Sequence, residues 1–210
     1  ACGIPLVLLS GWWTLLLLGL GIFFVLFYTW PLKYIALGEI TVLLVWGPLM
    51  IGGGYYAITG SWDWSVVIAS LPYALGVTGV IFGKHIDKYE ADKERKIYTL
   101  PVVIGEKAAR YVNMAVLALI YILILVLVFA TRFFTPILLI VFFAGKRLLY
   151  AIGVHAKPRP DEPPKEWQYW PTWFSGFAFY HNRLFSNLLL LAVLIDTILR
   201  LLLPTFWPAL

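Results

Sequence analysis

The chain has 210 residues, of which 61% are hydrophobic and only 13% are charged. Soluble domains usually carry about 25% charged residues, and a chain this short has too little interior to bury such an apolar excess. The composition therefore excludes an ordinary water-soluble domain, and basic loops beside a membrane explain the net charge of +5 better than nucleic-acid binding does.

Six apolar stretches are long enough to cross a bilayer, which takes about 20 helical residues. In chain order they are 3–27, 36–58, 64–84, 108–130, 135–153 and 184–203. We expect helices because the leucine runs in these stretches do not alternate as strands of a membrane barrel do. The sequence thus predicts an all-α, multi-span transmembrane bundle of about six helices, which forms one membrane domain over residues 1–210.

The connections between these stretches differ in charge. If successive spans alternate in direction, the loops 28–35, 85–107 and 154–183 share one side of the membrane, and the loops 59–63 and 131–134 lie on the other. Nearly all lysines and arginines fall on the first side. Positive loops stay in the cytoplasm, so we expect the long loops to be cytoplasmic, in a bacterial or archaeal cell membrane.

The segment 83–101 mixes acids and bases where an apolar stretch ends. Asp87, Glu90 and Asp92 can offer carboxylate oxygens to Mg²⁺, whose other ligands come from water and phosphate. Basic side chains in the same segment can bind the remaining phosphate oxygens; they are Lys84, Lys88, Arg95 and Lys96. Such a set suits the departure of a diphosphate, whereas the alternative is a solvated helix with i,i+4 ion pairs.

This segment resembles the second aspartate-rich motif of the UbiA family of intramembrane prenyltransferases. It ends in Thr99-Leu100-Pro101-Val102-Val103-Ile104-Gly105, similar to the family's TLPV…G, and Asp92 stands at the expected distance before that ending. A second stretch resembles the subgroup that prenylates 1,4-dihydroxy-2-naphthoate in menaquinone synthesis. It comprises Tyr28–Tyr34, Gly38-Glu39, Gly47-Pro48 and Gly53-Gly54-Tyr55-Tyr56.

The resemblance implies a helical bundle with a cavity open to lipid. Mg²⁺ and basic residues would bind a polyprenyl diphosphate there, and an aromatic acceptor would attack the allylic cation, which aromatic walls can stabilise. On this basis we assign catalytic roles to Lys33, Tyr34 and Glu39. We assign a prenyl or acceptor pocket to aromatic residues of the second stretch, namely Tyr28, Tyr55 and Tyr56.

Two features depart from the family pattern. Ala91 stands where the family has an aspartate four residues after Asp87, and Asp92 comes five residues after it, so the two aspartates would lie about 140° apart on an ideal helix. The family's first acidic motif is also absent. The resemblance therefore implies that this chain matches the last six of nine helices, and we expect residues 1–210 alone to be inactive.

Several polar residues allow two interpretations. Glu39 begins a span, where an ionisable group suggests function, although interfacial pairing with Lys33 explains it equally well. The aromatic group around Trp167 and Tyr169 anchors the chain at the interface or recognises a lipid substrate. His181-Asn182-Arg183 is a local anchor or a substrate contact. His85 is a bystander rather than a Mg²⁺ ligand, because this hard cation prefers oxygen.

Two other classes of function compete with prenyl transfer. A transporter or channel would place ionisable groups at mid-membrane, whereas the acids of this chain gather near one surface. A non-catalytic membrane protein descended from an enzyme is compatible with the absent first motif. The acids at one surface favour chemistry on an amphiphilic substrate.

Overall fold

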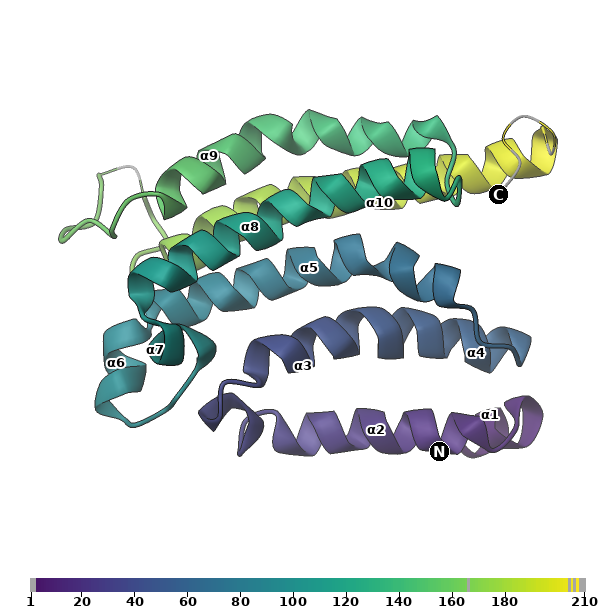
Figure 1. The fold of residues 1–210 in the computed structure, drawn as a ribbon, viewed down its shortest axis with the longest axis horizontal. Coiled ribbons are helices and arrows are strands. Elements are labelled where there is room, and N and C mark those ends of the chain that lie inside the picture. Colours follow the sequence, from purple (N-terminus) through teal and green to yellow (C-terminus); the bar gives the residue numbers. More distant parts are fainter. Residues whose placement is uncertain (1–2, 166, 204, 206, 208–210) are drawn as a thin grey trace.

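The computed structural model describes residues 3–165, 167–203, 205 and 207. Regular structure in this part of the chain is helical, and none of these residues belongs to a β-strand. The helices lie roughly alongside one another in an elongated bundle (Figure 1). Five of the resulting helical rods are long and apolar enough to cross a membrane, which confirms the predicted all-α, multi-span bundle.

The predicted first span, 3–27, is broken into two helices. α1 covers Gly3–Ser10 and α2 covers Trp13–Phe27. Gly11 lies between them with a φ of +87°, a conformation that costs glycine less than any other residue. Hydropathy misses this break because the residues on both sides are equally apolar. A short 3₁₀ helix, η1 (Leu32–Tyr34), follows α2.

The next rod runs from Gly38 to Thr59 and ends at Gly60, whose φ is +71°. It consists of α3 (Gly38–Leu44), the π-helical stretch η2 (Val45–Gly52) and α4 (Gly53–Thr59). Pro48 lies within η2, where its missing N–H interrupts the α-helical hydrogen bonds. The long helix α5 (Trp64–Asp87) follows, with Asp63 as its N-cap. The Asp63 carboxylate accepts a 2.7 Å hydrogen bond from the backbone N–H of Ser65.

Two short helices occupy much of the predicted loop 85–107, and three more rods follow. The short helices are α6 (Tyr89–Glu94) and α7 (Leu100–Ile104). The rods are α8 (Glu106–Leu125) with the π-helical η3 (Val126–Ala130), the 3₁₀ helix η4 (Pro136–Ala144) with α9 (Gly145–His155), and α10 (Phe174–Leu202).

α10 begins at Phe174, so the predicted start of this span at residue 184 is wrong. The first turns of α10 contain His181 and Asn182, which are polar yet buried against the rest of the bundle. A search for apolar runs stops at such residues. The predicted loop 154–183 is therefore shorter and ends at Trp173.

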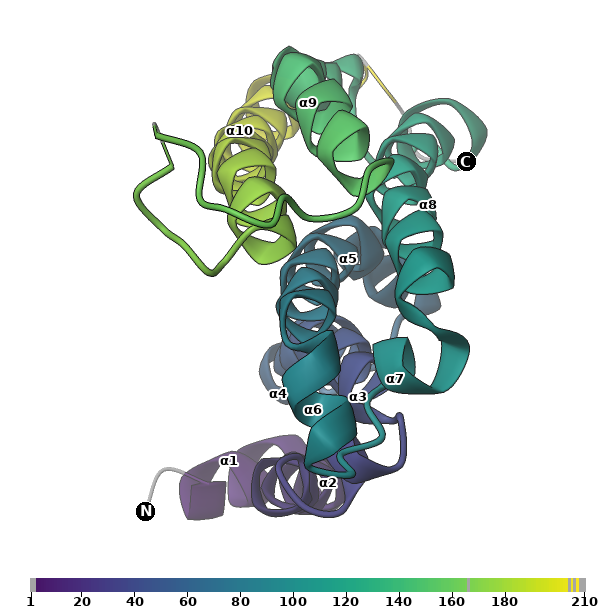
Figure 2. The ribbon, with the colours of Figure 1, turned by 90° about the vertical axis from the view of Figure 1, so that its left-hand side faces the viewer.

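α5 lies at the centre of the bundle. It packs against α10 and α8 on one side and against α3 and η2 on the other, as the end-on view shows (Figure 2). The main core lies among α5, α8, η4 and α10, where Leu117, Ile124 and Phe185 are fully buried. In α1 and α2, by contrast, Thr14 is the one described residue that is buried.

Three connections gather at one end of the bundle. The turn between α2 and α3, the α6–α7 segment and the loop 156–173 all lie at the left of Figure 1. The loops predicted to share one side of the membrane thus lie at the same end of the bundle, with the third of them ending at Trp173. This end holds the acid-and-base segment and is where a polar site can form.

Candidate functional site

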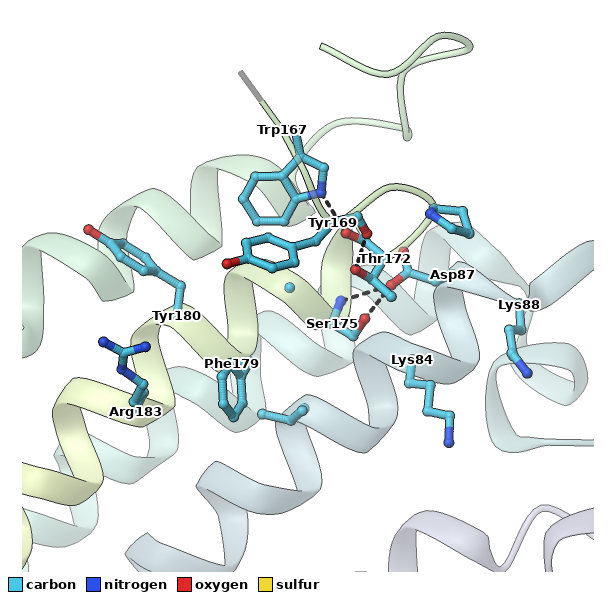
Figure 3. Close-up of a pocket in the computed structure, with 13 residues that line it drawn as sticks. Lys84, Asp87, Lys88, Trp167, Tyr169, Thr172, Ser175, Phe179, Tyr180 and Arg183 are labelled. Carbon is cyan, nitrogen blue, oxygen red and sulfur yellow. Dashed lines mark hydrogen bonds between the residues drawn. The ribbon is translucent and has the colours of Figure 1, made fainter. Parts of the chain in front are cut away.

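A pocket of about 550 Å³ lies between the end of α5 and the start of α10, beneath the loop 156–173. Figure 3 shows Trp167 and Tyr169 of the loop on one side, with Phe179 and Tyr180 of α10 close by. These aromatic side chains give the pocket largely apolar walls. Such a concave, mostly apolar cavity with a few polar groups is typical of a small-molecule site.

Three cationic side chains border this pocket. Lys84 and Lys88 come from the end of α5, and Arg183 comes from the third turn of α10. All three are exposed, and none forms an ion pair with a carboxylate in the described part of the chain. Unpaired lysine and arginine donors of this kind bind phosphate oxygens well.

The carboxylate of Asp87 closes the start of α10. It accepts hydrogen bonds from the backbone N–H groups of Trp173, Phe174 and Ser175 at 3.1, 2.9 and 3.0 Å, and from the Ser175 hydroxyl at 2.6 Å. The first N–H groups of a helix have no partner within the helix, and a negative charge there also complements the helix dipole. Asp87 is therefore a helix cap supplied by another helix.

Gly83 allows α5 and α10 to come close enough for this cap. A Cβ atom at Gly83 would lie 2.8–2.9 Å from backbone atoms of Phe174 and Ser175. No side chain can relieve such a contact, because the neighbouring atoms are main chain. The sequence Gly83-Lys84-His85-Ile86-Asp87 therefore brings a glycine and an acid, one helical turn apart, to the same helix junction.

A second buried contact joins α3 to α5. Oε1 of Glu39 lies 2.6 Å from Nδ1 of His85, and both side chains are at most 3% exposed. The other carboxylate oxygen of Glu39, Oε2, is buried without a hydrogen-bond partner. Because a buried, unpaired carboxylate oxygen is costly, this atom needs an explanation beyond packing.

The segment between α2 and α3 surrounds this pair. A Cβ atom at Gly38 would lie 3.5 Å from Cα of Lys33 and 3.6 Å from Cε1 of His85, so the three residues are neighbours. Burial and then the charge of Glu39 raise the pKa of Tyr28, which keeps this phenol neutral. An isolated parallel bridge between Ile35 and Tyr98 connects the same segment to the region that follows α6. Lys33, Glu39, His85 and Tyr28 thus lie together beside the acidic segment.

The chain matches one protein family over most of its length. The matching model is that of the UbiA prenyltransferase family, and it covers residues 1–182. The chain belongs to this family. With five helices of spanning length, this UbiA chain is an integral membrane protein.

Individual relatives match shorter stretches. The UbiA prenyltransferase domain-containing protein 1 homolog of Drosophila melanogaster is 30% identical over 77 residues, which are 37% of this chain and 21% of the relative. The protein of that name from Mus musculus is 33% identical over 73 residues, 35% of this chain and 22% of the relative. The 2-carboxy-1,4-naphthoquinone phytyltransferase of Synechocystis is 33% identical over 84 residues, 38% and 27% of the two chains. No solved structure matches the chain significantly.

The acids of the UbiA motif are not gathered into one cluster. No group of three or more His, Cys, Asp or Glu side chains among the described residues is arranged to hold a metal ion. Asp87 is occupied by the α10 cap, whereas Glu90 is exposed and Oδ2 of the buried Asp92 has no hydrogen-bond partner. Mg²⁺ at phosphate sites takes only one or two carboxylates, so Asp92, with its unpartnered Oδ2, fits such an ion. Glu90 is two positions away on α6 and therefore faces the other way, and Asp87 is held by the cap.

The remaining predicted residues are divided between the two ends of the bundle. Arg95 and Lys96 are exposed after α6 and do not line the pocket, and Tyr34 is half-buried in η1. Tyr55 and Tyr56 lie on α4, at the opposite end from the pocket (Figure 1). They are far from it because the rod that starts at Gly38 continues for 22 residues, about 30 Å of helix.

The sequence left open or missed several residues of this site. Trp167, Tyr169 and Arg183 line the pocket, which favours a contact with a ligand over anchoring alone. His181 and Asn182 instead point into the bundle, where His181 pairs with the hydroxyl of Tyr121 at 2.9 Å. No sequence signal identifies His85 or Ser175 as partners, because 46 and 88 positions separate them from Glu39 and Asp87.

Proposed function

We propose that this protein transfers a polyprenyl group from its diphosphate to an aromatic acceptor of the 1,4-dihydroxy-2-naphthoate type. The observation that carries the proposal is the pocket of Figure 3, which combines aromatic walls with three exposed cations. Membership of the UbiA family supports prenyl transfer, and the similarity to a naphthoquinone phytyltransferase supports the acceptor class. We further propose that this end of the bundle faces the cytoplasm of a bacterial or archaeal cell.

The diphosphate would bind between the two helices that form the pocket. Lys84 and Lys88 approach from α5 and Arg183 from α10, so the anion would be held from two sides. A Mg²⁺ ion bound by Asp92 would neutralise the charge that develops on the leaving diphosphate. Exposed Arg95 and Lys96, one turn further on, would attract the substrate over a longer range.

The prenyl chain would lie against the aromatic walls. Trp167, Tyr169 and Tyr180 border the pocket beside the cations. When the bond between the allylic carbon and the diphosphate oxygen breaks, positive charge develops on that carbon, and aromatic faces attract it. Removal of water from the pocket by these rings would also protect the cation from hydrolysis.

The acceptor would be activated from the side of α3. As its ring attacks the allylic carbon, the acceptor must lose a proton, and the unpaired Oε2 of Glu39 is a base with free capacity. His85 holds the other carboxylate oxygen and so fixes the orientation of the group. The Tyr28 phenol and Lys33 lie in the neighbourhood of Glu39 and would orient a hydroxyl group of the acceptor.

Binding and transfer can be tested separately. Radiolabelled geranylgeranyl diphosphate is added to detergent-purified protein, and its dissociation constant is measured for the wild type, Lys84→Gln and Arg183→Gln. We expect each variant to bind about tenfold more weakly, because each loses a charge-assisted contact. Lys107→Gln is the control, since Lys107 is exposed on α8 and lines none of the pockets described.

Transfer is measured by mass spectrometry after addition of Mg²⁺, geranylgeranyl diphosphate and dihydroxynaphthoate. Residues 1–210 and a longer chain that carries the family's first acidic motif are assayed in the same lipid. Asp92→Asn should lower turnover about a hundredfold in whichever form is active. Equal binding by Arg183→Gln and the Lys107→Gln control would refute the pocket as the diphosphate site.

A further inference from the structure

A second concave surface lies outside the proposed substrate pocket. It is a groove of about 880 Å³ between α9 and α10, which Pro164 and Trp167 of the loop also line. Its walls include Phe143 and Leu149, which are 79% and 70% exposed. Trp167 and Tyr180 border both this groove and the pocket, and so separate the two.

The groove contains a pair of cations within an apolar rod. Lys146 and Arg147 stand in the second half of the rod Pro136–His155. Charged groups inside membrane helices are costly and usually have a function. None of the described residues that line the groove is acidic.

Arg147 is held in a fixed position. Its guanidinium donates a 3.1 Å hydrogen bond to the carbonyl of Tyr180, and it lies 4.1 Å from the centre of the Tyr180 ring. A guanidinium carries five N–H donors, and one of them makes this bond. The others make no hydrogen bond to the described residues, so an anion beside the exposed Lys146 can bind them.

The depth of this pair matches that of a lipid headgroup. α10 has 29 residues, so it is about 43 Å long and exceeds the bilayer's hydrocarbon thickness of about 30 Å. Tyr180 lies in the second turn of α10, so Arg147 sits near the boundary between headgroups and acyl chains. Trp173 and Tyr150, which also line the groove, are residue types enriched at that boundary.

We propose that this groove binds one anionic phospholipid. The phosphate would sit between Lys146 and Arg147, and the acyl chains would run along Phe143 and Leu184 toward the middle of the membrane. Charge complementarity selects the headgroup, since basic pockets between membrane helices bind anionic lipids in this way. The proposal does not depend on the chemistry in the pocket of Figure 3.

Native mass spectrometry tests the proposal on the detergent-purified chain. Phosphatidylglycerol and phosphatidylcholine are titrated against the wild type, Lys146→Gln, Arg147→Gln and the control Lys107→Gln. We expect phosphatidylglycerol to bind in preference to phosphatidylcholine, and each groove variant to bind it roughly fivefold more weakly. Lys146 is exposed, so its variant keeps the test valid even if Arg147→Gln folds poorly.

Three outcomes would overturn the proposal. The first is equal affinity for the neutral and the anionic lipid. The second is equal loss of affinity in the Lys107→Gln control. The third is displacement of the lipid by geranylgeranyl diphosphate at concentrations that fill the wild-type pocket, with the displacement unchanged in Arg183→Gln. That result would mean that the groove is a substrate site rather than a lipid site.

Discussion

Two carboxylates lie at the same end of α5, one on α5 itself and one on α3. They differ in how many hydrogen bonds they accept. Asp87, at the junction with α10, accepts four hydrogen bonds. Glu39, at the contact with α3, has one oxygen near His85 and one with no partner. A fully satisfied buried group stabilises the fold, whereas an unsatisfied one is costly and suggests chemistry. We therefore expect Asp87 to stabilise the fold, and we propose that Glu39 takes part in the chemistry.

The largest expected effect follows from removal of the Asp87 carboxylate. Asp87→Ala leaves three N–H groups of α10 without an acceptor, so we expect the free energy of unfolding to fall by about 2–4 kcal/mol. Thermal melting of the protein in detergent measures the loss. Asp161→Ala is the matched control, because Asp161 is exposed in the loop.

If Asp87→Ala has the same melting temperature as the control, Asp87 does not stabilise the start of α10 and is available as a metal ligand. Asp87→Asn sharpens the result, since the amide keeps one acceptor oxygen. Loss of turnover in Asp87→Asn at unchanged melting temperature would restore Asp87 to the metal site.

The opposite behaviour is expected of Glu39. Glu39→Gln keeps the shape of the side chain and a contact with His85 but removes the base. We expect turnover in the active form of the enzyme to fall about a hundredfold, with little change in melting temperature. Glu94→Gln, at the exposed end of α6, provides the control. Unchanged turnover in Glu39→Gln would make the Glu39–His85 pair a purely structural contact.

A smaller effect is expected at Gly83. Gly83→Ala pushes a methyl group against the backbone of α10, so we expect it to cost about 1–3 kcal/mol of stability. Gly54→Ala is the control, because a Cβ atom there meets nothing within 4 Å and alanine is the better helix former. Equal melting temperatures for the two variants would show that α5 and α10 can separate freely.

The sequence predicts those parts of the fold that depend on local composition. Apolar runs locate α5, α8 and the rod that ends in α9 to within a few residues. The start of α10 cannot be found in this way, because the acceptor that begins it, Asp87, lies 86–88 positions earlier. The break between α1 and α2 cannot be predicted in this way either, since it depends on the backbone conformation of Gly11 rather than on hydropathy.

The candidate site follows the same division. Lys84, Asp87 and Lys88 are found from the motif because they are close together in sequence. The motif does not predict their roles, because Asp87 has the charge expected of a metal ligand and yet caps a helix. Tyr55 and Tyr56 match the family pattern, but they lie at the other end of the bundle. Sequence identifies residue types, whereas helix length and packing decide which of them meet.

The loop between α9 and α10 has both of its ends fastened to one residue. Arg159 donates a 3.1 Å hydrogen bond to the carbonyl of Asp87, and Trp173 donates one to the carboxylate of the same residue. Arg159 and Trp173 are therefore both held beside Asp87, whatever the length of chain that connects them. Doubling the length of a flexible connection costs only about 0.6 kcal/mol of closure entropy. Insertions or deletions between these two residues should thus reshape the border of the pocket during evolution while the helices stay in place.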